Sequence, residues 1–413
     1  MVETNKKYWL YILPYVYCCI KDTKALLYNT QTGGNMEICI PEILELLRSL
    51  HEKQNLGCIR YDGKILEHEP YRSFLIEFCR KGMGNLSDVE ETPEKPIQLM
   101  PVLNLQRDVE KMQKEQDRSI GEDILRYLLE VNIYLNNDCR QDCRFCSDYF
   151  RQSLCCTKID AGQRAEMKLS LLQNLLSQIR FGHVGKLNFL GGNILKYLHY
   201  EKLTYLLEDF KERVHIWNHY ANYINTNTLI HDFLYDIPVT FPVDEKAWNN
   251  CLVLFKDKQA KYHFFITGIE DYEKTEELIN NCKLINYSVH PVYTQKNQDF
   301  FEEYVYTNQE EIFQTIRSFR QIFSRQKLNT WFFGSLTIFP DGSIYANVNS
   351  SSLGNIESDR LLDIIDKEMI ENTAWRKIRD MAPCDSCLYQ FLCLSPSNYE
   401  LVMKKPDLCH LNK

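Results

Sequence analysis

The sequence has no excess of basic residues. Its 48 lysines and arginines are outnumbered by 56 aspartates and glutamates, which gives a formal net charge of −8 at pH 7. Nucleic-acid-binding proteins carry a basic surface that neutralises phosphates. The composition therefore argues against a nucleic-acid partner.

Long apolar runs are also missing. No run approaches the roughly 18 apolar residues that mark a membrane-spanning helix. The first apolar stretch, YWLYILPYVYCC, is interrupted by Pro14. It lacks the basic segment and the small terminal residues of a secretory signal. We therefore expect a cytoplasmic protein with no membrane partner.

Tandem repeats are absent as well, and the 413 residues are enough for two or three domains. Residues 7–40 alternate in strand fashion as three segments, with Gly33-Gly34 as a hairpin signal between the second and third. Pro41 then opens a helical pattern, and a second helix stops at Gly82. This order predicts a small unit of strands followed by helices, and a polar linker after it.

From residue 131 the pattern becomes a series of strands alternating with helices. Such alternation predicts a parallel α/β sheet or barrel, in which ligands gather at the C-terminal ends of the strands. The predicted strands are VNIYLN, KLNFLGG, ANYINTN, DIPVTFPVD, KYHFFITGI and NYSVHPVY.

Sixteen cysteines need an explanation, because disulfides are rare in the cytoplasm. Most scattered cysteines behave as small buried apolar residues. Cys155 and Cys156 are adjacent, and adjacent thiolates rarely share one metal. The scattered cysteines are Cys18, Cys19, Cys39, Cys58, Cys79, Cys251 and Cys282.

A first cysteine cluster directly follows the predicted strand VNIYLN. Cys139, Cys143 and Cys146 form a C-x3-C-x2-C pattern. A structural zinc site needs a fourth ligand, which His183 or Asp148 could supply. Three thiolates on one short loop instead favour an iron–sulfur cluster that leaves one iron position open.

This loop resembles that of the radical S-adenosylmethionine (radical SAM) superfamily, in which an aromatic residue, here Phe145, often precedes the last cysteine. The resemblance implies a four-iron, four-sulfur (4Fe–4S) cluster on Cys139, Cys143 and Cys146, with SAM on the open iron. Reductive cleavage of SAM would then generate a radical, and that chemistry belongs to the cofactors.

The same resemblance assigns SAM contacts to the ends of the next strands. FLGGN takes the place of a Gly-Gly-Glu element, INTNT that of a TNG element, and VTFPVDE that of a Ser-x-Asp-Gly element. Asn193 replaces the expected Glu, and Phe241-Pro242 lies near the place of the Ser. The implied cofactor-binding residues are Gly191, Gly192, Asn193, Asn225, Asn227 and Asp244.

A second cysteine cluster lies near the C-terminus and resembles a SPASM domain, the cluster-binding extension of many peptide-modifying radical SAM enzymes. The stretch LTIFPDGSIYAN has Asn347 where that domain has a cysteine, and Ser397 replaces another. Four cysteines remain, and they imply one auxiliary 4Fe–4S cluster. A structural zinc on the same thiolates is the alternative. These ligands are Cys384, Cys387, Cys393 and Cys409.

The whole chain resembles the radical SAM and pseudo-radical-SAM proteins of the Gly-Gly-leader peptide systems of Bacteroidales. The implied fold is α/β, a partial (β/α) barrel with an N-terminal winged-helix-like α+β domain and a C-terminal SPASM-like domain. The N-terminal domain would bind the leader of a precursor peptide by adding a strand to a sheet. The implied divisions are 1–85 for leader recognition, 86–127 for a linker and helix, 128–328 for the barrel and 329–413 for the SPASM-like domain.

Three functions follow from these expectations. The first is a radical SAM maturase of a ribosomally made precursor peptide, to which we assign no catalytic residue. The second is a pseudo-radical-SAM protein that keeps the fold and the clusters but only binds the peptide or presents it to a second maturase. It is favoured by Asn193, Phe241-Pro242, Asn347 and Ser397. The third is a zinc-stabilised α/β binding protein.

Overall fold

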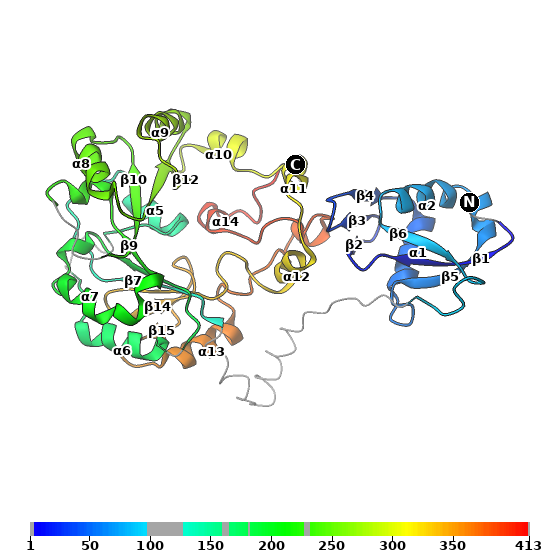
Figure 1. Cartoon of the computed structure of the whole chain (residues 1–413), viewed down its shortest axis with the longest axis horizontal. Helices are drawn as coiled ribbons and strands as arrows, with labels where there is room; N and C mark the ends of the chain where they lie inside the picture. The colour runs from blue at the N-terminus through cyan, green and yellow to red at the C-terminus, as the bar shows by residue number, and fades with distance from the viewer. Residues whose placement is uncertain (1–3, 97–126, 159–164, 181, 227–231, 412–413) are drawn as a thin grey trace.

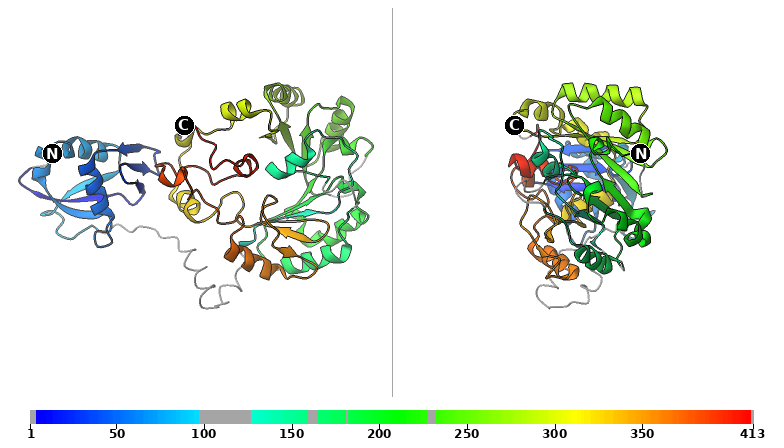
Figure 2. Two further views of the ribbon diagram at one scale, coloured as in Figure 1. Left: turned by 180° about the vertical axis from the view of Figure 1, so that it is seen from behind. Right: turned by 90° about the vertical axis from the view of Figure 1, so that its left-hand side faces the viewer.

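The structure is a computed structural model that describes residues 4–96, 127–158, 165–180, 182–226 and 232–411. Figure 1 shows a small N-terminal unit on one side and a larger α/β unit on the other. C-terminal segments, including α14 (Asn398–Met403), lie between the two, as the reverse view in Figure 2 also shows.

The N-terminal unit contains two small antiparallel sheets and two helices. The first sheet has the order β5-β1-β6 and the second the order β2-β3-β4. The apolar faces of both helices and both sheets form one core. The elements are β1 (Lys7–Ile12), β2 (Val16–Ile20), β3 (Ala25–Asn29), β4 (Asn35–Ile38), α1 (Pro41–His51), β5 (Cys58–Asp62), η1 (Gly63–Glu67), α2 (Tyr71–Arg80) and β6 (Gly84–Asp88).

Two features of this unit differ from the sequence-based prediction. The first predicted strand is divided into β1 and β2, which belong to different sheets. The chain turns between them at Leu13-Pro14, where the N–H of Val16 donates to the carbonyl of Leu13 at 3.0 Å. Strands β5 and β6 were not predicted. Strand β6 pairs with β1 and extends into the segment that we expected to be linker. The β3–β4 hairpin and the helix that begins at Pro41 are confirmed.

The larger unit is built on a nine-stranded sheet in which six adjacent strands, starting from one edge, are parallel and follow one another in chain order. The order β12-β11-β10-β9-β8-β7 continues through β13, parallel to β7, into the antiparallel strands β14 and β15. This singly wound order is that of a (β/α) barrel, here open on one side. The strands are β7 (Glu130–Tyr134), β8 (Lys186–Leu190), β9 (Val214–Trp217), β10 (Leu234–Thr240), β11 (Ala260–Ile266), β12 (Tyr287–Pro291), β13 (Ser335–Ile338), β14 (Ser343–Tyr345) and β15 (Gly354–Asn355).

Side chains alternate across this sheet, which gives its two faces different chemistry. In β7, Val131 and Ile133 join the main apolar core, whereas Asn132 lies on the other face among polar side chains. The helices and helical turns that follow the strands are α5 (Cys146–Gln152), α6 (Leu169–Ile179), η3 (Ile194–Lys196), η4 (Tyr200–Lys202), α7 (Leu203–Leu206), η5 (Glu208–Arg213), η6 (Tyr220–Tyr223), α8 (Glu245–Phe255) and α9 (Ile269–Cys282).

The mixed α/β fold and the parallel sheet are as predicted, but the third strand is not. ANYINTN was predicted as a strand, and the structure has the helical turn η6 there instead. The strand is β9, which begins where the helical pattern YEKLTYLLEDFKERV (200–214) ends, in a segment where we predicted no strand. Tyr223 packs edge-on against Phe255, 4.9 Å between ring centroids, so a tertiary contact holds the turn.

The C-terminal region joins the two units. It contains α10 (Gln298–Tyr304), α11 (Gln309–Gln314), α12 (Phe319–Lys327), α13 (Leu361–Glu371), η7 (Cys384–Ser386) and α14. Tyr17, Leu26 and Tyr28 of the N-terminal unit pack in one apolar cluster with Ile312 and Leu392. In the part of the chain that is described, no helix has the length and hydropathy needed to cross a membrane.

Candidate cluster site

The three cysteines of the first cluster lie around one small cavity. Cys139 and Cys143 lie on the loop after β7, and Cys146 begins α5. Gly192, which follows β8, lines the same cavity. The sequence-predicted triplet is therefore brought together at the C-terminal ends of the parallel strands.

Polar neighbours surround two of these thiols. The hydroxyl of Thr240 lies 3.8 Å from the Sγ of Cys143, and the Nε2 of His219 lies 3.9 Å from it. The backbone N–H of Gln141 donates to the Sγ of Cys139 at 3.4 Å. Hydrogen bonds to sulfur are among the groups that tune iron–sulfur clusters.

Burial changes the protonation of these cysteines. It raises the pKa of Cys139 to about 11 and that of Cys143 to about 12, and for both the nearby thiol of Cys156 is the next cause. Both groups are thus neutral thiols at pH 7 in the absence of a cation. Metal ligation requires thiolates, so metal binding here would release protons.

The donor set fits an iron–sulfur cluster better than a single ion. Within the described residues, no three His, Cys, Asp or Glu side chains are grouped closely enough to hold one metal ion. Neither His183 nor Asp148 lines the cavity of the triplet. A cluster takes each thiolate on a different iron, and soft thiolates are its usual ligands.

The Gly-Gly turn has a structural reason within the chain itself. A Cβ on Gly192 would lie 2.8 Å from the backbone carbonyl carbons of Asn137 and Asp138, and one on Gly191 would lie 2.6 Å from the Oδ1 of Asn136. These are closer than real Cβ contacts. The glycines therefore allow the cysteine loop to pack directly on the end of β8.

Asn193 is buried and occupied by local contacts. Its Oδ1 accepts the N–H of Leu195 at 3.1 Å and caps the turn η3. Its own N–H donates to the carbonyl of Asp138 at 2.7 Å. The side-chain oxygen that was expected to face SAM therefore accepts a hydrogen bond from the backbone N–H of Leu195 instead.

Of the remaining predicted SAM contacts, Asp244 lines a second pocket together with Cys143 and Thr240. Asp244 caps α8, because its Oδ1 accepts the N–H of Ala247 at 2.7 Å. Asn225 is exposed beyond η6. Asn227 lies outside the described residues. Of the five predicted cofactor-binding residues that the structure describes, Gly192 is the one that lines the small cavity with all three cysteines.

Sequence reasoning missed other residues at this site. His219 and Asn222 come from the end of β9 and from η6, and Asn222 donates to the carbonyl of Gly192 at 3.4 Å. Cys155 and Cys156 also line the cavity. Correct placement of β9 would have pointed to His219 and Asn222. No sequence signal indicated that the chain after α5 returns to the triplet.

The second cysteine set is also gathered in space. Cys384, Cys387 and Cys409 all affect the ionisation of Cys393, although burial is the main reason that its pKa is raised to about 12. The guanidinium of Arg379 lies 3.8 Å from the Sγ of Cys384 and lowers its pKa, against a larger effect of burial. Such a cation favours thiolates at this set.

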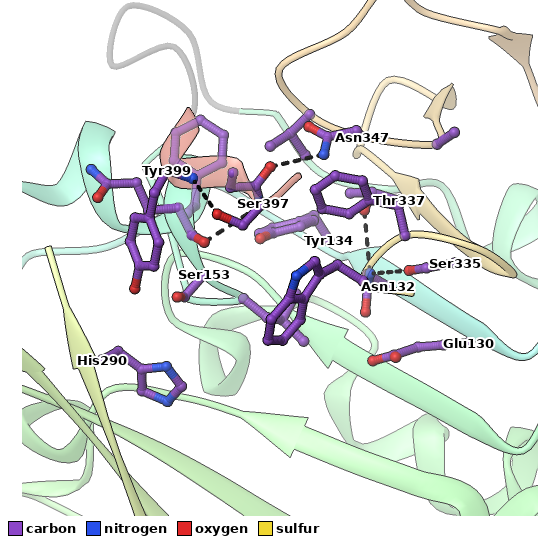
Figure 3. A pocket seen from close by; sticks show the side chains of 18 of the residues that line it. Glu130, Asn132, Tyr134, Ser153, His290, Ser335, Thr337, Asn347, Ser397 and Tyr399 are labelled. Atoms are coloured by element: carbon purple, nitrogen blue, oxygen red, sulfur yellow. Dashed lines mark hydrogen bonds between the residues drawn. The ribbon is translucent and has the colours of Figure 1, made fainter. Parts of the chain in front are cut away.

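The positions that replace the missing SPASM cysteines have other roles. Ser397 and Glu400 form a capping box at the start of α14, and Glu400 pairs with Arg379 at 2.6 Å. Asn347 donates to the Oδ1 of Asn398 at 2.8 Å. Both Asn347 and Ser397 line a large cavity beside the sheet (Figure 3).

This large cavity has a volume of about 510 Å³ and lies between the inner face of the sheet and the C-terminal region. Glu130 and Asn132 of β7 line one wall, and His290 of β12 lies across from them in Figure 3. Aromatic side chains and amides make up much of the remaining wall, as in many sites for peptides and small molecules. Those side chains are Tyr134, Phe150, Trp331, Phe332, Tyr399, Gln152, Asn347 and Asn398.

Of three kinds of comparison with known proteins, the one with solved structures gives matches. No family model and no curated protein matches the sequence. Among solved structures, SuiB from Streptococcus suis bound to S-adenosylmethionine is similar at 12% identity, with a TM-score of 0.44 over 97% of this chain and 98% of that chain. SuiB bound to the precursor peptide SuiA gives 12% identity and a TM-score of 0.41 over the same shares. A third SuiB structure gives 13% identity and a TM-score of 0.44 over 97% of this chain and all of that chain.

Proposed function

We propose that this protein is a peptide-binding protein of the radical SAM type that holds a cluster on Cys139, Cys143 and Cys146 but does not cleave SAM. It would bind a ribosomally made precursor peptide and present it to a partner maturase. A cluster at this site, when bound, supplies an electron-transfer centre. Binding and presentation of the peptide would depend on the chain's own residues.

The contacts of Asn193 carry this proposal. Its side-chain oxygen caps η3, and the Gly-Gly turn before it is covered by the cysteine loop. A carboxylate at this position would accept charge-assisted hydrogen bonds from an ammonium group, about twice as strong as those of a neutral amide. A site with a neutral, already bonded acceptor is poorly suited to hold SAM.

Peptide binding is supported by the cavity and by the small sheets. Amides, aromatic rings and the carboxylate of Glu130 line the 510 Å³ cavity, so it offers hydrogen-bond partners and apolar contacts for a peptide segment. Strands β5 and β6 are the outer strands of the first sheet. Addition of a leader strand to such an edge would give backbone-mediated affinity.

A second candidate, the active maturase, is favoured by one observation: all three thiols of the triplet lie at one cavity. The test is anaerobic reconstitution with iron and sulfide, followed by incubation with SAM, dithionite and a precursor peptide. We expect cluster absorbance without 5′-deoxyadenosine. Formation of 5′-deoxyadenosine would overturn the proposal in favour of the maturase.

Two further measurements sharpen this test. Zinc as the sole metal in protein purified without oxygen would favour the zinc-stabilised binding protein. Asn193→Glu restores the carboxylate of the family element, and Asn249→Glu, at an exposed position on α8, is its matched control. A gain of SAM binding in the first variant alone would show that this position decides cofactor affinity.

A further inference from the structure

A pocket of about 360 Å³ lies beside α12, and its wall is basic. Arg320, Ser324 and Arg325 of α12 line it, together with Thr330 and Trp331 from the loop before β13. None of the described residues that line this pocket carries a carboxylate. The pocket therefore presents two guanidinium groups with no opposite charge in its own wall. We call it the arginine pocket.

Arg325 is the buried member of this wall, with 6% of its surface exposed. One of its N–H groups donates to the carbonyl of Leu392 at 2.6 Å. Its Nε is buried and has no hydrogen-bond partner among the described residues. Burial, and then the neighbouring Arg317, lowers the pKa of Arg325 to about 10, so the side chain is still charged at pH 7. Buried charges in proteins are ordinarily paired, so this one indicates a missing anion.

The neighbouring arginines do not supply that anion. Arg317 and Arg379 both add positive charge near Arg325. Arg379 is itself neutralised by Glu400 at 2.6 Å. Between described residues, no ion pair joins a carboxylate to Arg317, Arg320 or Arg325. The positive charge at the arginine pocket is therefore left for a group from outside this part of the chain.

The arginine pocket adjoins the 510 Å³ cavity beside the sheet, because Trp331 lines both. The indole N–H of Trp331 donates to the carbonyl of Ser395 at 3.1 Å, and the N–H of Thr330 donates to the hydroxyl of Ser395 at 3.0 Å. These bonds fix the wall that the two hollows share. A peptide segment in the large cavity would need to pass one side chain to reach the arginine pocket.

We propose that the arginine pocket binds a carboxylate group of the peptide that occupies the large cavity. A guanidinium group binds a carboxylate through two parallel charge-assisted hydrogen bonds, and Arg325 has N–H donors left for them. This inference rests on the proposed peptide-binding function. It adds a chemical class for part of the peptide, which is an acidic side chain or a free C-terminus.

The test uses the full chain and two matched pairs of short peptides. The first pair is acetyl-Gly-Glu-Gly-amide and acetyl-Gly-Gln-Gly-amide, and the second is acetyl-Gly-Gly-Gly as the free acid and as the amide. Inorganic phosphate is a further probe. Binding is followed by tryptophan fluorescence at low ionic strength, where charge attraction is least screened. Trp331→Phe identifies the signal that comes from the shared wall.

We expect the wild type to bind the acidic member of at least one pair about tenfold more tightly than its neutral partner. The pair that shows the preference identifies the source of the carboxylate, side chain or C-terminus. Arg325→Gln should remove most of the preference, and Arg320→Gln should reduce it. Lys327→Gln is the matched control, because Lys327 lies on the same helix but does not line the pocket.

Equal affinities within both pairs, or no binding of any of these peptides, would overturn the inference. A preference that persists in both Arg320→Gln and Arg325→Gln would also contradict it, since the buried guanidinium would then serve the fold or the second cysteine set. Phosphate binding as tight as that of the acidic peptides would mean a general anion site and no peptide recognition. If Arg325→Gln does not fold, Arg320→Gln decides alone, because Arg320 is exposed. Failure of the proposed function is separate, since formation of 5′-deoxyadenosine would leave the preference unchanged.

Discussion

At the scale of single residues, the inner face of the sheet carries a buried polar network. Asp236 accepts hydrogen bonds from the Nδ1 of His215 at 2.6 Å and from the Nε2 of His263 at 2.7 Å. Burial alone would raise the pKa of Asp236, but these two bonds hold it well below its usual range. The Nδ1 of His263 is therefore an acceptor, and the Nε2 of His290 lies 3.0 Å from it. We assign the Nε2–H of His290 as donor, which leaves its Nδ1 as an acceptor at the wall of the large cavity.

The first prediction concerns pH and His290. Burial, then the neighbouring His263 and Lys261, lowers the pKa of His290 to about 3 from 6.5. The unfolded chain thus binds a proton more readily than the folded one, and stability is lost as pH falls from about 6.5 towards 3. The lost free energy of unfolding should reach about 2 kcal/mol at pH 5 for this residue. Urea unfolding followed by tryptophan fluorescence at pH 7.5 and pH 5 measures it.

The control for this prediction is the exposed His183. His290→Gln should reduce the difference in stability between pH 7.5 and pH 5, while His183→Gln should leave it unchanged. An equal pH dependence in wild type and His290→Gln would contradict the assignment. Asp236 and His263 remain in both variants, so part of the dependence should persist.

The second prediction concerns the contact between Gly192 and the cysteine loop. Gly192→Ala places a methyl group against the backbone of Asn137 and Asp138, which must move away. We expect a loss of about 1–3 kcal/mol in the free energy of unfolding. Cluster incorporation should fall with it, because Cys139 follows directly. Chemical denaturation and iron content per chain measure the two effects.

Gly268→Ala is the control variant for Gly192→Ala. No atom lies within 4 Å of the position that its Cβ would take, and the backbone is extended there. Its effect should stay within about 0.5 kcal/mol. Similar losses in both variants would mean that the cysteine loop does not depend on the close approach at Gly192.

At the scale of the elements, α14 illustrates how a short helix begins. Ser397 accepts the N–H of Tyr399 at 3.1 Å, and Glu400 accepts the N–H of Ser397 at 2.8 Å. Helix starts leave backbone N–H groups without intrahelical partners, and this capping box satisfies them. Glu400 also holds Arg379, which lies against Cys384. The cap of α14 therefore supports the second cysteine set.

The third prediction concerns Ser397, which stands where the SPASM resemblance would place a cysteine. Ser397→Cys should add no iron, because the residue caps a helix and lines the large cavity. Ser397→Ala should lower stability by about 1 kcal/mol through loss of the cap. In the same metal analysis, Cys384→Ser should lower the metal content. An increase in iron in Ser397→Cys would show that the position can reach the cluster.

At the scale of the whole molecule, the second small sheet docks on the C-terminal cysteine region. The hydroxyl of Tyr28 accepts the N–H of Arg317 at 2.8 Å. Lys21 donates to Gln390 at 2.8 Å, and Glu37 accepts the hydroxyl of Tyr389. Tyr389 lies between Cys387 and Cys393 in the chain. The proposed peptide-recognition unit and the predicted auxiliary metal site therefore share one interface.

The fourth prediction separates docking from folding of the N-terminal unit. Leu26 and Leu27 are adjacent and fully buried, but Leu26 packs in the interface cluster and Leu27 in the core of the unit. Leu26→Asp should raise amide hydrogen exchange at residues 388–392 and leave β1 and β5 protected. Leu27→Ala should reduce protection within the unit itself, at a cost of about 2–5 kcal/mol. Unchanged exchange at 388–392 in Leu26→Asp would contradict the docking role.

The sequence was sufficient for features that depend on local pattern. The hydrophobic runs of β7, β8 and β10 to β12 and the cysteine spacing could all be read directly. Strand β9 has four residues and adjoins a helical pattern, so its place depends on neighbouring strands. Asn193 and Asp244 act as helix caps, which the sequence pattern did not indicate. The return of Cys155 and Cys156 to the cavity of the triplet depends on tertiary packing. The cysteine ligands themselves stay a prediction.

The docking of the N-terminal unit has a consequence for synthesis of the chain. Residues 4–96 leave the ribosome before residues 384–409, and an elongating chain separates them by roughly 15–60 s at about 5–20 residues per second. During that interval Leu26 and Tyr28 have no partner from the C-terminal region to cover them. Nascent chains are therefore expected to need a chaperone at this surface. The four predicted ligands of the second cysteine set are all present only after translation has passed Cys409.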